Sequence, residues 1–120
     1  MKVVDWAHVE VVRMNEKITR QLIASKQVRH GGLARFFMAK GAVVPEHQHE
    51  SEQFSQILSG QLKFVFRDCE IVVRGGEVLY IPSGVPHAAE ALSDTVAMDV
   101  FSPIRKDWLA GEDAYLRGQA

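Results

Sequence analysis

Short apolar runs, rich in β-branched and aromatic residues, recur along most of the chain and are separated by turn residues. We expect strands at residues 9–12, 18–24, 33–38, 43–45, 54–58, 61–67, 69–74, 77–82 and 95–101. Glycine and proline lie between these runs, as in Gly75-Gly76 and Pro82-Ser83-Gly84. Strands that recur every ~8–12 residues between such turns are typical of a β-sandwich or β-barrel. The sequence therefore predicts an all-β fold.

The C-terminal stretch RKDWLAGEDAYLR differs from the rest of the chain. Its apolar residues Trp108, Leu109, Tyr115 and Leu116 suit one face of a helix better than a strand. Gly111 interrupts the segment, because glycine is a poor helix former. We therefore expect a short C-terminal helical segment, packed on the outside of the β domain.

The size, charge and cysteine content of the chain limit its number of domains, its partners and its cellular compartment. Its 120 residues suit one domain, placed at 1–120, and a net charge of −1 gives no general attraction to nucleic acid or anionic membranes. No apolar stretch approaches the ~20 residues of a membrane span. Asp5, His8 and Glu10 interrupt the N-terminal apolar run, which argues against a signal peptide. Cys69 is the single cysteine and has no partner for an internal disulfide. We expect a cytoplasmic protein.

Two histidines, His47 and His49, stand one residue apart in the polar stretch PEHQHESEQ. Residues two apart on a strand share a face, so these imidazoles would point toward the same place, and neutral imidazole is a common metal ligand. The alternative is a pair of solvent-exposed histidines in a polar loop. The pattern of the two histidines alone does not separate these interpretations.

Two longer spacing patterns enclose this pair. The first contains Gly41, His47, His49, Gln53 and Gly60, separated by five, one, three and six residues. The second contains Gly76, Pro82, Gly84 and His87, separated by five, one and two residues. These are the spacings of the two motifs of the cupin superfamily, which the chain resembles from residue 9 to residue 104. Motif one then covers 41–60 and motif two covers 76–91.

The resemblance implies a double-stranded β-helix, the jelly-roll barrel of the cupins, with one divalent transition metal in its cavity. Zinc, nickel, iron and manganese are all compatible with the expected ligands, which are His47, His49, Gln53 and His87. Gln53 departs from the family pattern, because most metal cupins have glutamate there, and Glu50 and Glu52 are out of register. A neutral ligand set leaves the charge of the cation uncompensated. It therefore favours polarising a substrate oxygen over redox chemistry, although three-histidine dioxygenases occur among cupins.

A third group of residues occurs at the end of the last predicted strand and just after it, in the pattern D-x-F-x-x-x-R, and consists of Asp99, Phe101 and Arg105. Alternation places the apolar residues Val96, Met98 and Val100 in the core, and so predicts that Asp99 faces solvent. The alternative is a sheet buried on both faces, with Asp99 in the cavity as an acid or base.

These residues, together with H-x-H-x-x-x-Q and His87, resemble the small cupins of the KdgF type, which act in pectin and alginate breakdown. The resemblance implies an enzyme that converts 4,5-unsaturated monouronates, the products of lyases, to their linear ketonised form. Our hypothesis assigns Asp99 as the acid–base group, Arg105 as the partner of the uronate carboxylate and Phe101 as a wall of the sugar site. Small cupins are often dimers, so we expect a homodimer.

Other functions fit the same motifs. A cupin dioxygenase would depend on the three histidines but not on Asp99 or Arg105, and it would consume oxygen. An isomerase or epimerase acting on another sugar acid would differ only in the shape of the pocket. A non-catalytic small-molecule-binding cupin is the remaining alternative.

Overall fold

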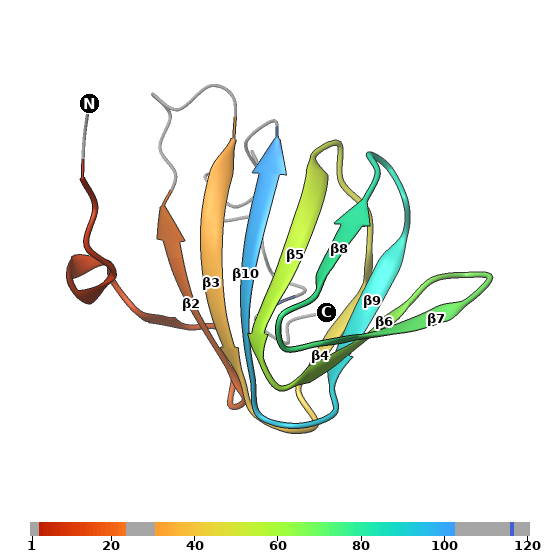
Figure 1. Ribbon diagram of the computed structural model, residues 1–120, viewed down its shortest axis with the longest axis horizontal. Coiled ribbons are helices and arrows are strands. Elements are labelled where there is room, and N and C mark those ends of the chain that lie inside the picture. Colours follow the sequence, from red (N-terminus) through yellow and green to blue (C-terminus); the bar gives the residue numbers. More distant parts are fainter. Residues whose placement is uncertain (1–2, 24–30, 103–115, 117–120) are drawn as a thin grey trace.

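The computed structural model describes residues 3–23, 31–102 and 116. Two antiparallel sheets form the domain (Figure 1). The larger has the strand order β1-β2-β3-β10-β5-β8 and the smaller the order β4-β9-β6-β7, so neighbours in a sheet are mostly distant in sequence. Buried side chains from both sheets form one core between them. The predicted all-β jelly roll is therefore confirmed.

The six-stranded sheet contains β1 (Val12–Arg13), β2 (Ile18–Ile23), β3 (Gly32–Met38), β5 (Glu52–Ser59), β8 (Val78–Ile81) and β10 (Thr95–Ser102). The four-stranded sheet contains β4 (Val43–His47), β6 (Gln61–Val65), β7 (Glu70–Arg74) and β9 (His87–Ala91). The helix η1 (Trp6–His8) is a single 3-10 turn before β1. No helix in the described ranges is long and apolar enough to cross a membrane.

The structure corrects the strand predictions at two places. The run predicted at 9–12 is a strand only at Val12, and η1 precedes it because the Asp5 side chain accepts a hydrogen bond from the Ala7 amide at 2.9 Å. The strand β9 was not predicted, since alanine-rich HAAEA has a low intrinsic strand preference. It forms nevertheless because it pairs with β4 on one side and β6 on the other.

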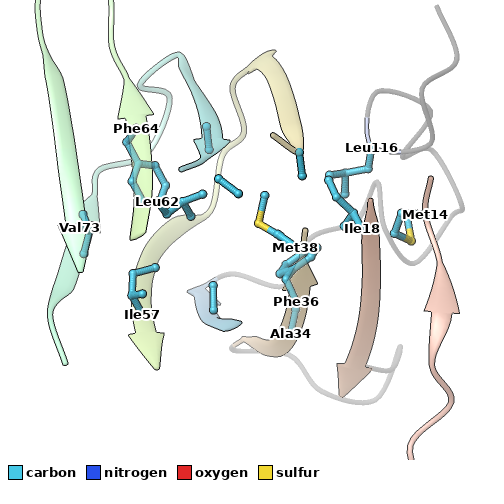
Figure 2. Close-up of a cluster of buried hydrophobic side chains, with 14 of the residues drawn as sticks. Met14, Ile18, Ala34, Phe36, Met38, Ile57, Leu62, Phe64, Val73 and Leu116 are labelled. Atoms are coloured by element: carbon cyan, nitrogen blue, oxygen red, sulfur yellow. The ribbon is translucent and has the colours of Figure 1, made fainter. Parts of the chain in front are cut away.

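Buried apolar side chains from the strands of both sheets form the core (Figure 2). On β6, Leu62 and Phe64 are buried, as the alternation of that run predicts. On β5, the buried residues are Gln53, Ser55 and Ile57, so this strand gives the interior two polar side chains as well as an apolar one. The interior of the barrel is therefore apolar toward one end of β5 and polar toward the other.

The facing of β10 is opposite to the one predicted from alternation. Ala97 and Phe101 are 2% and 1% exposed, whereas Val100 is 46% exposed. Val100 lies outside because its register partner on β5, Phe54, belongs to a row of apolar side chains on the outer face of the sheet. The expectation that Val96, Met98 and Val100 face the core is therefore wrong, and Asp99 lies on the inner face.

The C-terminal prediction is only partly covered by the described residues. Leu116 is buried in the core cluster, and its carbonyl oxygen accepts a hydrogen bond from Asn15 Nδ2 at 2.9 Å. The predicted helical segment with Trp108, Leu109 and Tyr115 otherwise lies outside the described ranges, as does Arg105.

Candidate metal centre

Three histidines meet at one end of the four-stranded sheet. His47 ends β4 and His87 begins β9, and the two are direct register partners with ring centroids 4.4 Å apart. His49 lies two residues beyond β4, where its carbonyl oxygen accepts a hydrogen bond from the Gly84 amide at 2.9 Å. Pairing of β4 with β9 thus positions His47 and His87. The backbone hydrogen bond from Gly84 positions His49.

The three imidazoles are close enough to share one cation. One ligand atom from each of His47, His49 and His87 lies within 4.8 Å of the others. The ring centroid of His49 is 5.6 Å from that of His47 and 5.2 Å from that of His87. His87 is buried and the other two are half-buried, so the group opens toward solvent on one side.

Each imidazole is oriented by a nearby backbone carbonyl. The Nδ1 atoms of His47 and His87 lie 2.9 and 2.8 Å from the carbonyl oxygens of Pro45 and Val85. The Nδ1 atom of His49 lies 2.8 Å from the carbonyl oxygen of Ser51. A carbonyl oxygen can only accept, so Nδ1 carries the proton in each ring and Nε2 keeps its lone pair. This is the tautomer that a metal ligand needs, with the orienting partner usual for metal-bound histidine.

Gln53 completes the group from β5. Its side chain is 6% exposed, and its Nε2 atom donates to Ser55 Oγ at 2.8 Å and to Asp99 Oδ2 at 3.2 Å. Its Oε1 atom lies 3.1 Å from Nε2 of His49. With the proton of His49 on Nδ1, both of these facing atoms carry lone pairs, and a bound cation would satisfy them together. The residues therefore fit a metal ion held by three imidazoles and an amide oxygen.

A cavity connects this group to the interior of the barrel. Its polar lining residues are His47, Gln53, His87 and Asp99. Its apolar lining residues are Phe36, Met38, Val44, Leu62, Phe64, Ala89, Ala97 and Leu116. Asp99 is partly buried and shares the cavity with the candidate ligands, which places a carboxylate beside the metal group.

The family of the chain follows from this arrangement and from its sequence. A family model described as a cupin domain matches residues 34–102. This chain belongs to the cupin domain family. No curated protein sequence matches the cupin at a significant level.

Several solved structures are similar in fold to the cupin. An RmlC-like cupin from Shewanella frigidimarina NCIMB 400 matches with a TM-score of 0.78 and 22% identity, over 88% of this chain and 93% of that one. KdgF from Halomonas sp. matches with a TM-score of 0.74 and 25% identity, over 83% and 93%. The polyketide cyclase RemF from Streptomyces resistomycificus matches with a TM-score of 0.71 and 26% identity, over 86% and 79%. The first likeness supports the fold alone.

The remaining predicted site residues lie in different places in the cupin. Phe101 is 1% exposed and belongs to the core cluster, and it is not among the described residues that line the cavity. Glu50 is exposed and is not part of the metal group. Glu52 is also exposed and accepts a hydrogen bond from the Tyr80 hydroxyl at 2.8 Å, a bond that raises the pKa of Tyr80. Both glutamates are therefore out of register, as the motif spacing predicted.

Sequence reasoning missed Ser55, which is fully buried and contacts the amide of Gln53. The signal that could have found it is alternation, because Ser55 is two residues from Gln53 on the same strand and so shares its face. A buried serine in a strand needs a hydrogen-bond partner. Gln53 is the partner that the structure supplies.

Proposed function

We propose that this cupin is a metal-dependent, non-redox enzyme that opens the ring of 4,5-unsaturated monouronates and ketonises the product. The observation that carries the proposal is the contact between Asp99 and Gln53, because it puts a carboxylate in the same cavity as the metal group. The similarity to KdgF at 25% identity supports the same conclusion.

The reaction is an isomerisation and needs no oxidant or reductant. The proton of the anomeric hydroxyl leaves, the bond from C1 to the ring oxygen breaks, and C1 becomes an aldehyde. The ring oxygen remains on C5 as an enolate, and protonation of C4 turns this enolate into a ketone. The enzyme must therefore move one proton from an oxygen and place one on a carbon.

The proposed roles combine the positions of the described side chains with the resemblance to the KdgF-type cupins. Asp99 would move these protons, and a positioned acid–base group contributes about 10²–10⁴-fold to the rate. His47, His49, Gln53 and His87 would hold the metal, which as a Lewis acid would polarise a substrate oxygen. Arg105 would bind the uronate carboxylate through its planar guanidinium. We propose that Phe101 supports the site from the core and does not touch the sugar, because it belongs to the core cluster and is not among the described residues that line the cavity.

The test uses an unsaturated monouronate prepared with a lyase. Its C=C bond, conjugated to the carboxylate, absorbs in the ultraviolet, and metal-loaded protein should make this absorbance disappear faster than in buffer alone. Asp99→Asn should remove most of the acceleration. The control Asp68→Asn, which changes an exposed carboxylate in the turn after β6, should retain it. No acceleration by metal-loaded wild-type protein would exclude this substrate.

A second candidate function is ring closure of an apolar substrate, and the apolar part of the cavity lining favours it. The similarity to the polyketide cyclase RemF, at 26% identity, points the same way. Displacement of a fluorescent aromatic probe from the cavity by an apolar polyketide, without turnover of the uronate, would support this candidate. Oxygen uptake by the iron-loaded protein would instead support a dioxygenase.

We also propose that the protein is a homodimer, as expected from the sequence. Light scattering coupled to gel filtration tests this directly. A measured mass near the 13.4 kDa of one chain would contradict it.

A further inference from the structure

We infer that Asp99 and Ser55 are positioning residues that turn the amide oxygen of Gln53 toward the metal group, and that Asp99 is the reason for an amide at position 53. The inference rests on the metal site proposed above and not on the uronate substrate. This relation explains why the fourth ligand position holds glutamine where most metal cupins have glutamate.

The amide of Gln53 has two N–H donors and one oxygen acceptor. Its nitrogen lies 2.8 Å from Ser55 Oγ and 3.2 Å from Asp99 Oδ2, so both donors have acceptors. An ionised carboxylate can only accept, so the NH₂ group must be the side of the amide that faces Asp99. The oxygen is then directed to the opposite side, where it lies 3.1 Å from Nε2 of His49. Asp99 thus decides which end of the amide is offered to a metal.

The backbone holds these three side chains in register. Gln53 and Ser55 share the inner face of β5, and Ser55 is the register partner of Asp99 on β10. Ser55 has no exposed surface, so its hydroxyl cannot turn to water in place of the amide. Asp99 lies opposite Ser55 and diagonal to Gln53, a relation fixed by the hydrogen-bonded ladder of the sheet.

A carboxylate at position 53 does not suit this arrangement. It would replace the donating nitrogen by an oxygen about as close to Asp99 Oδ2, and two ionised carboxylates at that distance repel each other. The amide removes the repulsion and adds a hydrogen bond with the carboxylate as acceptor. Glutamine at 53 and aspartate at 99 are therefore chemically complementary, and so would be glutamate at 53 with asparagine at 99.

The test is a double-mutant cycle with cobalt(II) affinity as the readout, measured by titrating metal-free protein at one fixed pH. The four proteins are the wild type, Gln53→Glu, Asp99→Asn and the double variant. The cycle cancels the direct attraction between Asp99 and the cation, since that attraction is lost in both backgrounds. We expect the loss of affinity caused by Asp99→Asn to be at least about tenfold smaller when Gln53→Glu is already present, or to reverse. Equal fold-changes in the two backgrounds would overturn the inference.

Ser55 is tested separately. Ser55→Ala should weaken cobalt(II) binding about tenfold, because it leaves a buried N–H of Gln53 without its acceptor. It should also shift the visible absorption bands of bound cobalt, which report the ligands and which a loss of stability alone would not move. The control Ile57→Val alters a buried residue on the same face of β5 and should leave affinity and bands unchanged. Unshifted bands in Ser55→Ala would overturn its assigned role.

These outcomes are separable from the fate of the proposed function. If the coupling is found and the uronate is not turned over, the positioning role is supported and only the substrate is wrong. If wild-type protein binds no cobalt(II), the metal site and the inference are overturned together.

Discussion

Gln53 and Asp99 are in contact across β5 and β10, with the amide nitrogen of one 3.2 Å from a carboxylate oxygen of the other. This contact links the candidate metal ligands to the proposed acid–base group. The two parts of the site therefore cannot be changed independently, and substitutions at either residue must be interpreted with metal content measured alongside activity.

Asp99→Asn should lower the turnover number for the unsaturated uronate by about 10²–10⁴-fold, because the variant removes the group proposed to transfer protons. The measurement uses saturating metal, so that weaker metal binding does not reduce the rate. Circular dichroism and metal content check that the variant is folded and loaded. Full turnover by a loaded Asp99→Asn protein would show that the acid–base assignment is wrong.

His87→Ala should abolish stoichiometric metal binding, because the imidazole of His87 is buried and its centroid lies 4.4 and 5.2 Å from those of His47 and His49. A metal at 100 times its dissociation constant stabilises the folded state by about 2.7 kcal/mol. Adding a chelator should therefore lower the melting temperature of the wild type but not that of His87→Ala. His8→Ala, which changes an exposed histidine outside the group, is the control and should respond like the wild type.

Leu116→Ala should cost about 2–5 kcal/mol of unfolding free energy, as is usual for a leucine buried in a core. Leu116 also lines the cavity, so the substitution should enlarge the space beside the metal group. Urea unfolding gives the stability, and Leu58→Ala, at a leucine 44% exposed on the outer face of β5, is the matched control. Equal losses in the two variants would show that the C-terminal residue does not belong to the core in solution.

A comparison of Gly60→Ala with Gly76→Ala separates two causes of lost stability, the strain of a positive φ angle and the steric clash of an added Cβ atom. Both glycines have positive φ angles, +89° and +90°, which an alanine adopts at a cost of about 1–2 kcal/mol. A Cβ atom at Gly76 meets nothing within 4 Å, whereas one at Gly60 would collide with the carbonyl oxygen of Asp94 and lie 2.8 Å from Thr95 Cα. Urea unfolding should therefore show a clearly larger loss for Gly60→Ala. Similar losses for both would mean that strain dominates at each position.

Much of the fold was predictable because strand signals and motif spacing are local properties of the sequence. The resemblance to the cupins, which two spacing patterns carry, implied the set His47, His49, Gln53 and His87, and the structure brings these side chains together. The reason given for the first pair was incomplete. His49 lies beyond the end of β4, and a hydrogen bond from Gly84, not strand alternation, holds its backbone.

The facing of Asp99 could not be predicted from alternation because the outer face of the sheet is itself apolar. Val100, Phe54 and Tyr80 are neighbours across three strands and are 46%, 50% and 45% exposed. A rule that assigns the more apolar face to the core fails where both faces carry large apolar side chains. The role of Ser55 was missed for a different reason. Alternation places Ser55 on the same face as Gln53 but does not show that the two side chains form a hydrogen bond.

The carbonyl oxygens that orient the imidazoles all come from within two residues of the ring that they hold. Two short peptides, Pro45 to Ser51 and Val85 to His87, therefore contain the groups that orient the three imidazole rings. The sheets have only to bring these two peptides together. A metal centre built in this way could be moved to another protein. Transplanting both peptides onto another jelly roll with the same strand pairing should carry the ring orientations with them, while the choice of fourth ligand would remain with the host.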